Sequence, residues 1–150
     1  MAGAGLKHNI IVSNLSGHIG AFLIGRNFRL LLSDRRVSTP TLEVYLYPDA
    51  LIAYGESQLE NDQLDTLLNP SVSFEILSTS TRSSYKDRKF FFYRQIPSLQ
   101  ACITVDSLKN IYSWAANKRM LPGSLKTLIP VPCLHRSLIL PSPWKIPIRK

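Results

Sequence analysis

The chain has 150 residues, of which 45% are hydrophobic, and carries a formal net charge of +8. This length is enough for one domain with a core of its own. A run of about 18 apolar residues is absent, which excludes an ordinary transmembrane helix. The opening MAGAGLKHN also lacks the basic and long apolar segments of a signal peptide. We therefore expect a cytoplasmic protein that does not associate with membranes.

The positive charge is concentrated near the C-terminus. Residues 1–106 contain ten basic and ten acidic residues, whereas residues 107–150 contain eight basic residues, no acidic residue and six of the ten prolines. We expect a folded core over residues 1–106 and a divergent, basic, proline-rich segment over residues 107–150. Two interpretations of this segment stay open: it contacts phosphate groups, or it is a poorly folded end whose charge reflects no particular partner.

The first expected element is an amphipathic helix over residues 8–24, ended by Gly25. Its apolar side chains recur at steps of three and four residues, which places them on one helical face. Gly17 and Gly20 lower the helical propensity and indicate close packing against another element. The apolar positions are Ile11, Val12, Leu15, Ile19, Phe22 and Leu23.

Short strands are expected next. Residues 28–33 and 35–38 predict a strand or a bent strand, and a turn follows at residues 39–41. Residues 42–47 predict a second strand, which a proline interrupts. Residues 50–54 continue that strand or begin a third.

The following segments alternate between polar and apolar character. Residues 55–70 predict a surface connection with a short helical turn at residues 64–68. A buried strand is expected over residues 71–77 and a helix over residues 84–95. Further strands are expected at residues 101–105 and 111–115. This order of elements predicts a mixed α/β fold whose sheet is covered on both faces.

Two carboxylates stand in otherwise apolar surroundings. Asp49 lies within VYLYPDALIAY, and Glu75 lies within VSFEIL. Because burying a carboxylate without a partner is costly, we expect the two side chains to share a cation, provided that their strands are neighbours. One or two carboxylates completed by water and phosphate oxygens are typical of Mg²⁺. Lys89, on the following helix, is the candidate for orienting water or stabilising charge on a phosphodiester.

Each of these residues also has a simpler interpretation, as a turn residue, an edge carboxylate and a solvated lysine. His8 is expected to be a helix cap or a surface residue. Cys102 and Cys133 lack any motif spacing and are expected to be free thiols. The chain shows neither a zinc-ligand spacing nor a glycine-rich phosphate loop.

At these residues the sequence resembles the Uma-type family of restriction endonucleases, within the PD-(D/E)xK nuclease superfamily. The stretches that carry the resemblance follow one another in the family's order between residues 8 and 106. No single stretch is specific, but their combination is. They are HNIIVSNL, SDRRV, YPDALIAYGE, LDTLLNPSVSFEILSTST and KFFFYRQIPSLQ.

The resemblance implies an α/β, restriction-endonuclease-like fold with a mixed central sheet flanked by helices, and Mg²⁺-dependent DNA cleavage. Asp49 looks like the acid of the PD element and Glu75 like the second acid. The usual position of the superfamily's lysine is Leu77 here, but Lys89 matches the K-F-x-x-Y-R pattern by which this family carries its lysine on the next helix. The groups expected around the site are His8, Ser78, Tyr93 and basic side chains of the helices.

Three departures from the family keep a second function open. Members usually begin earlier, with an E-L-I-x-G-E segment, and the opening methionine here looks internal to it. The resemblance fades after Asp106, and YKDRKF is one residue shorter than the common pattern. The chain is therefore expected to be a Mg²⁺-dependent DNA endonuclease or a shortened, non-catalytic relative that binds DNA through basic residues. Nucleases that cut both strands are often dimers, so a homodimer stays open too.

Overall fold

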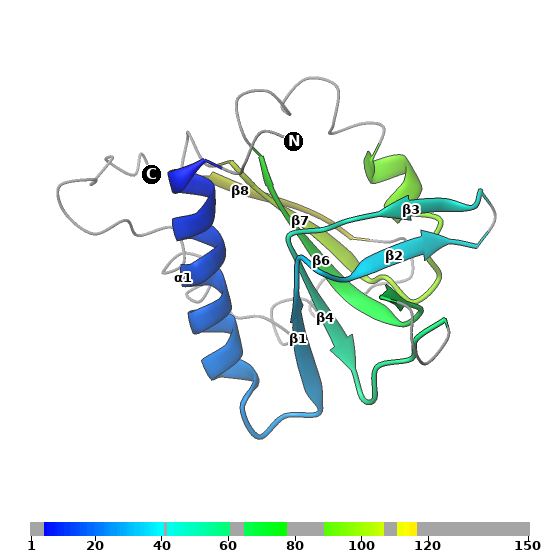
Figure 1. Ribbon diagram of the computed structural model, residues 1–150, viewed down its shortest axis with the longest axis horizontal. Helices are drawn as coiled ribbons and strands as arrows, with labels where there is room; N and C mark the ends of the chain where they lie inside the picture. Colours follow the sequence, from blue (N-terminus) through cyan, green and yellow to red (C-terminus); the bar gives the residue numbers. More distant parts are fainter. Residues whose placement is uncertain (1–4, 41, 61–64, 78–88, 107–110, 117–150) are drawn as a thin grey trace, which may run out of the picture.

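A mixed five-stranded sheet forms the centre of the protein (Figure 1). The computed structural model describes residues 5–40, 42–60, 65–77, 89–106 and, as backbone alone, 111–116. In the central sheet only β6 and β7 run parallel, and the other neighbours are antiparallel. Its strands, in spatial order, are β1 (Phe28–Leu32), β4 (Ala50–Tyr54), β6 (Pro70–Leu77), β7 (Ala101–Asp106) and β8 (Ile111–Ala116).

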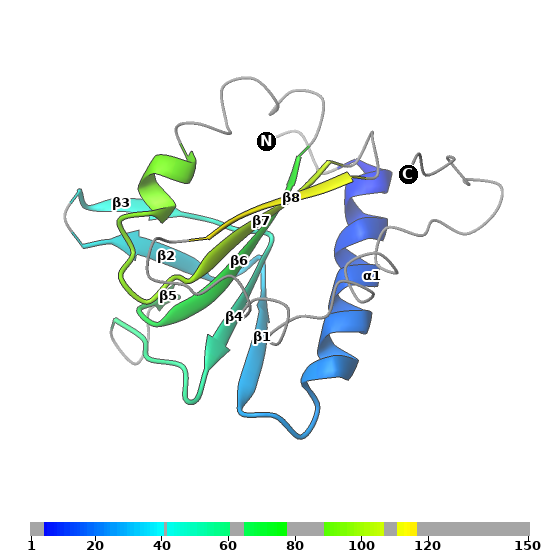
Figure 2. The same ribbon diagram turned by 180° about the vertical axis from the view of Figure 1, so that it is seen from behind.

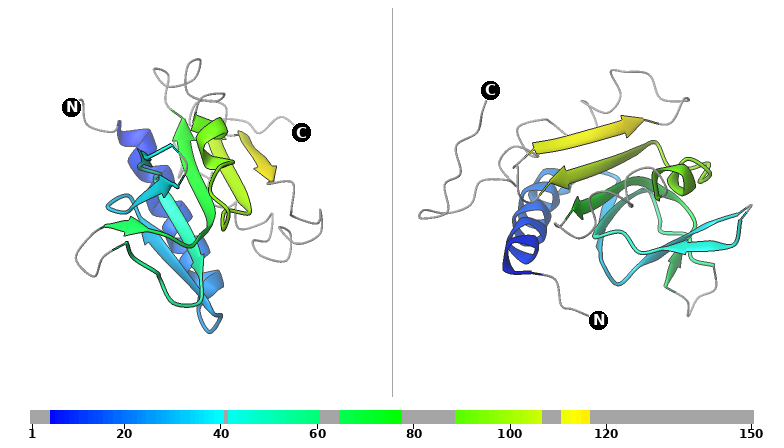
Figure 3. Two further views of the ribbon diagram at one scale, coloured as in Figure 1. Left: turned by 90° about the vertical axis from the view of Figure 1, so that its right-hand side faces the viewer. Right: turned by 90° about the horizontal axis from the view of Figure 1, so that it is seen from above.

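A smaller three-stranded sheet and one long helix complete the described fold. The small sheet has the order β3 (Val44–Leu46), β2 (Arg36–Thr39), β5 (Thr66–Leu67). The helix α1 (Leu6–Leu23) lies on one side of the central sheet, and β2 and β3 lie on the other side (Figures 1 and 2). A short helical segment over residues 89–93 approaches the end of β3, where Lys89 Nζ lies 3.5 Å from the Tyr47 carbonyl oxygen. The right-hand view of Figure 3 shows α1 and the small sheet on opposite sides of the central sheet.

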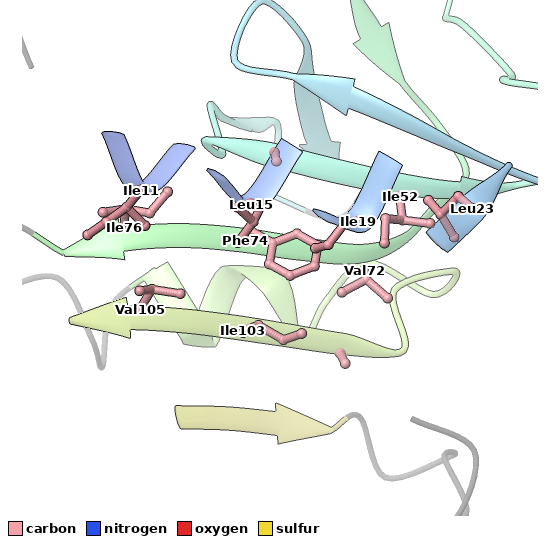
Figure 4. Packing of buried hydrophobic residues seen from close by; sticks show 12 residues of the cluster. Ile11, Leu15, Ile19, Leu23, Ile52, Val72, Phe74, Ile76, Ile103 and Val105 are labelled. Atoms are coloured by element: carbon pink, nitrogen blue, oxygen red, sulfur yellow. The ribbon is translucent and has the colours of Figure 1, made fainter. Parts of the chain in front are cut away.

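The helix packs through one apolar stripe. Ile11, Leu15, Ile19 and Leu23 recur every fourth residue and are all buried against the central sheet (Figure 4). The helix ends before Gly25, whose φ of 75° is the left-handed conformation that glycine adopts without strain after a helix. The helix α1 therefore covers one face of the central sheet, as the spacing of its apolar residues predicts.

Strand β6 is buried along its whole length because both of its faces are covered. Val72, Phe74 and Ile76 belong to the core beneath α1. The residues between them alternate to the opposite face, where a second core joins the small sheet and the helical segment. That second core contains Val37, Leu46, Leu51, Ala53, Leu67, Tyr93, Ile96, Leu99 and Cys102. Glu75 therefore points into a covered face and not into open solvent.

Most expected elements are found close to their expected positions. The helix predicted over residues 8–24 is α1, and the buried strand predicted over residues 71–77 is β6. Residues 28–33 and 35–38 become two strands, β1 and β2, which belong to different sheets. The helix predicted over residues 84–95 is helical at 89–93, and residues 84–88 lie outside the described part.

The helical turn predicted at residues 64–68 is wrong. Thr66–Leu67 form strand β5, which pairs in parallel with β2. Two contacts with Arg36 hold it there: the Arg36 amide donates to the Asp65 carbonyl (2.9 Å), and Arg36 Nε donates to Thr66 Oγ1 (2.6 Å). Long-range pairing and burial of Leu67 outweigh the local preference of this short polar segment.

The central sheet continues past residue 106 through β8, at the position expected for a strand over 111–115. The boundary between a core and a basic segment at residue 106 stays a prediction. Cys102 is a buried free cysteine, as expected, and Cys133 lies outside the described residues. No helix of the described part is long and apolar enough to cross a membrane.

Replacing Leu15 with alanine is expected to lower the free energy of unfolding by about 2–5 kcal/mol, because the change leaves a cavity between α1 and the sheet. Leu15 is fully buried, at 0% exposure. Urea denaturation measures the change. Ser13→Ala, at an exposed position of the same helix, is the matched control and is expected to shift stability by less than about 0.5 kcal/mol. An equally small effect of Leu15→Ala would contradict the packing of α1.

Candidate active site

The two carboxylates singled out from the sequence come from neighbouring strands. Strands β4 and β6 pair antiparallel, with Ala50 opposite Phe74, so the residue before β4 lies next to Glu75. The Asp49 amide donates to the Phe74 carbonyl (3.0 Å), which continues the pairing by one step. The condition that the two strands be neighbours is thereby met.

Both oxygens of the Asp49 carboxylate are engaged. His8 Nε2, near the start of α1, lies 3.0 Å from Asp49 Oδ1. The Ile76 amide, in β6, donates to Asp49 Oδ2 (2.7 Å). The carboxylate therefore joins the helix to the sheet, and its direction is set from two sides. About a fifth of each side chain in the His8–Asp49 pair is exposed (19% and 20%), so the site opens to solvent here.

The expectation that His8 caps the helix or lies on the surface is wrong. The residue at the N-cap is Gly5, which makes no side-chain capping bond. His8 is half-buried and reaches a residue 41 positions away in the sequence. Its Nδ1 is buried and has no hydrogen-bond partner among the described residues. An N–H left unpaired there would be costly, so the Nε2–H tautomer, which donates to Asp49, suits this environment.

Glu75 is held by two side chains of the helical segment. Lys89 Nζ donates to Glu75 Oε1 (2.6 Å), and the Tyr93 hydroxyl donates to the same oxygen. Lys89 and Tyr93 are four residues apart, which places them on one helical face. Lys89 Nζ also lies 3.5 Å from the Tyr47 carbonyl oxygen, at the end of β3. The lysine thus reaches the second acid despite its distance along the chain.

Opposing influences act on the pKa of the Glu75 carboxyl. Burial raises the pKa of the Glu75 carboxyl, Lys89 and Tyr93 lower it, and the charge of Asp49 raises it. The overall shift is upward because removal of the carboxylate from water outweighs its two donors. Asp49 and Glu75 are therefore close enough to repel each other, and a cation between them would relieve this repulsion.

The site has parts that no sequence pattern identifies. The Ile76 amide and the Tyr47 carbonyl act through backbone atoms, so residue type carries no signal for them. Tyr93 is expected only from the family resemblance, and Ser78 lies outside the described residues. Burial raises the pKa of the Cys102 thiol to about 11, which favours the protonated, unreactive form at neutral pH.

Two comparisons place the sequence among known proteins. Residues 1–119 match the model of the Uma2 family, described as "Putative restriction endonuclease". The chain is 35% identical over 106 residues to the uncharacterized protein sll1609 of Synechocystis. That match covers 71% of this chain and 60% of the relative, so the chain spans less than two thirds of the relative's length.

The fold resembles that of a solved structure. This is the crystal structure of a "putative nuclease belonging to DUF820" from Anabaena variabilis, with a TM-score of 0.65 and 17% sequence identity. The match covers 91% of this chain and 84% of that one. It confirms the fold class expected from the sequence, a mixed α/β architecture of the nuclease-like kind.

In the metal-free protein, the Glu75 carboxyl is expected to make the free energy of unfolding fall as the pH rises. The Glu75→Gln variant is expected to lack this fall. Since the pKa of Glu75 is raised above its ordinary value of 4.5 in the folded chain, the folded state holds this proton more tightly. The resulting stabilisation is fully present below the unfolded pKa and is lost as pH rises through the folded pKa. Urea denaturation from about pH 4 to pH 8 with a chelator measures the slope. Glu56→Gln, at an exposed carboxylate, is the control, and an unchanged slope in Glu75→Gln would contradict the shift.

Proposed function

Because the chain belongs to the Uma2 family, we propose that it is a Mg²⁺-dependent endonuclease that hydrolyses DNA phosphodiester bonds. Asp49 and Glu75 would hold the metal, and Lys89 would be the catalytic cation. One observation carries this proposal: a buried carboxylate, Glu75, lies beside a second carboxylate and 2.6 Å from a lysine ammonium. Membership of a family of restriction endonucleases supports the reaction class and the need for a divalent metal. The contacts of the side chains support the roles given to Asp49, Glu75 and Lys89.

The donor chemistry fits a hard divalent cation. Carboxylate oxygens are the ligands that Mg²⁺ prefers, and it usually keeps several waters or phosphate oxygens as well. The described residues contain no group of three His, Cys, Asp or Glu side chains that could hold a metal ion. Among these residues no third side chain of this kind joins the two carboxylates, so water and phosphate oxygens would complete the coordination. Zinc, which favours histidine and cysteine, suits this set less well.

The protein's own groups would orient the reacting parts. His8 and the Ile76 amide hold the Asp49 carboxylate, and Tyr93 holds Glu75. When bound, a divalent cation would supply Lewis-acid chemistry that activates water and offsets phosphate charge. Lys89 would place its ammonium group where negative charge develops on the phosphoryl oxygens, a role worth several kcal/mol only if the group is held in advance. Its contacts with Glu75 and the Tyr47 carbonyl supply that restraint.

The Asp49→Ala/Glu75→Ala double variant is expected to lose both Mg²⁺ binding, measured by calorimetry, and nicking of a supercoiled plasmid. Lys89→Met is expected to nick about 10²-fold more slowly, because it removes the ammonium group that would stabilise charge on the phosphoryl oxygens. Since it also removes one of the two donors to the buried Glu75 carboxylate, its stability and Mg²⁺ binding are measured beside its activity. Glu56→Ala is the control, because its exposed carboxylate follows the far end of β4, opposite to the end that Asp49 precedes. Circular dichroism checks that each variant folds, and Asp49→Asn and Glu75→Gln replace the double variant if it does not.

The non-catalytic alternative makes a different prediction for the same measurements. A relative that only binds DNA through basic residues would bind plasmid with an affinity that falls steeply with salt. Mg²⁺ and the two carboxylates would then have no effect on that affinity. A well-folded chain that binds no Mg²⁺ and nicks no plasmid would contradict our proposal and favour this alternative.

His8→Ala is expected to weaken Mg²⁺ binding by roughly 10-fold or more, because loss of a group that orients a metal ligand typically costs 10- to 100-fold in affinity. His8→Gln is expected to restore much of it, since the glutamine amide nitrogen can occupy nearly the position of Nε2 and donate to Asp49. Calorimetry on both variants measures the effect. His18→Ala, an exposed histidine of the same helix, is the control. Equal losses in His8→Ala and His8→Gln would contradict a positioning role.

A further inference from the structure

The outer face of the small sheet exposes two tyrosines next to the candidate site. Along β3 and the residue after it, Leu46 is buried while Tyr45 and Tyr47 are 43% and 59% exposed. The alternation follows from the pleat of the strand, which sends successive side chains to opposite faces. The two rings are two residues apart along one extended segment, so both project from the same face.

An arginine lies with these tyrosines and is held in place. Arg36 Nε donates to Thr66 Oγ1 (2.6 Å), and its guanidinium carbon lies 4.2 Å from the centre of the Tyr45 ring. The Tyr47 hydroxyl also interacts with Arg36 and raises the pKa of its guanidinium. We call Arg36, Tyr45 and Tyr47 the Tyr–Arg cluster. Its planar groups are arranged before any ligand binds, which lowers the entropy cost of binding.

The cluster and the candidate site share one segment of chain. Tyr47 is two residues before Asp49, so their Cα atoms are at most roughly 7 Å apart. The Tyr47 carbonyl oxygen lies 3.5 Å from Lys89 Nζ. A strand with a phosphate at Asp49, Glu75 and Lys89 would therefore pass close to the segment that carries the two tyrosines.

We propose that the Tyr–Arg cluster is a stacking surface for unpaired bases of a nucleic-acid strand whose phosphate lies at the candidate site. This inference rests on the proposed nuclease function and narrows its substrate to nucleic acid with a single-stranded stretch or end. Tyrosine rings and guanidinium planes stack on bases of any sequence. Bases within a duplex are covered by their neighbours, so a stacking surface reads only bases that are unpaired or extruded.

The surrounding charges favour stacking over simple phosphate attraction. The charge of Glu60 acts on Arg36, and the neighbouring Arg35 pairs with Asp65 (2.7 Å). Within the described part of the chain, the positive charges of Arg35 and Arg36 are thus each balanced by a neighbouring carboxylate. An interaction here should depend on ring area and only weakly on ionic strength, in contrast to contacts made by a field of unpaired basic residues.

A second copy of the chain is the other occupant that this surface could accept. In the small sheet β3 is an edge strand, and tyrosine is also common at protein interfaces. The shared segment with the candidate site, together with the stacked arginine, favours nucleic acid. Self-association through the cluster is therefore an outcome that the test below must detect.

The test measures binding of a fluorescein-labelled, mixed-sequence single strand and of the same sequence as a blunt duplex, by anisotropy, in a chelator that prevents cleavage. The Tyr45→Ala/Tyr47→Ala variant is expected to bind the single strand more weakly by roughly 5- to 150-fold for each stacked base lost, and to bind the duplex almost unchanged. The Tyr45→Phe/Tyr47→Phe variant keeps the rings and is expected to bind the single strand nearly as the natural chain does. Tyr54→Ala, an equally exposed tyrosine (60%) at the opposite end of β4, is the control.

Three results would overturn the inference: an unchanged single-strand affinity, an equal loss for duplex, or a phenylalanine variant as weak as the alanine variant. Sedimentation that shows a dimer in the natural chain and a monomer in the alanine variant would assign the surface to self-association instead. The nuclease proposal fails separately. If the chain binds single strands through the tyrosines but nicks no plasmid with Mg²⁺, the stacking surface is supported and the nuclease function is contradicted. If it nicks plasmid and the tyrosines have no effect on binding, the nuclease function is supported and the stacking surface is contradicted.

Discussion

The arrangement of this protein depends on one buried ion pair, between Glu75 and Lys89. Glu75 stands in a strand that is covered on both faces, and a carboxylate in such a place is stable only with close donors. The helical segment supplies two of them, Lys89 and Tyr93, to the same oxygen. Removing one partner of such a pair leaves a buried charge unpaired, which typically costs far more than loss of a surface ion pair.

Each layer of the fold contributes one part of the candidate site. The helix α1 brings His8 to Asp49, the central sheet brings the two carboxylates together, and the small sheet ends at the Tyr47 carbonyl. The groups are thus held by packed elements and not by a single loop, which favours the fixed geometry that electrostatic stabilisation requires. The same meeting point explains why a stacking surface on β3 would lie beside the reacting phosphate.

Local patterns predicted the elements well and the short connections poorly. The apolar spacing of α1 and the continuous burial of β6 follow directly from side-chain periodicity. Strand β5 was expected as a helical turn, because its two residues carry no periodic signal and become a strand only by pairing with β2. For the same reason the local pattern suggested a cap or a surface position for His8, and only the family resemblance placed it near the site. A contact with a residue 41 positions away leaves no trace in the surrounding residues.

Side-chain type and spacing were enough to predict the family, the fold class and most elements, and to single out two acids among apolar residues, because they record how deeply each position is buried. Which groups meet became known from the folded chain: the register that sets Asp49 beside Glu75, the contacts of Lys89 and Tyr93 with one oxygen, and the stacking of Arg36 on Tyr45. These contacts join distant segments, and packing and strand pairing set them, so no local pattern specifies the partner.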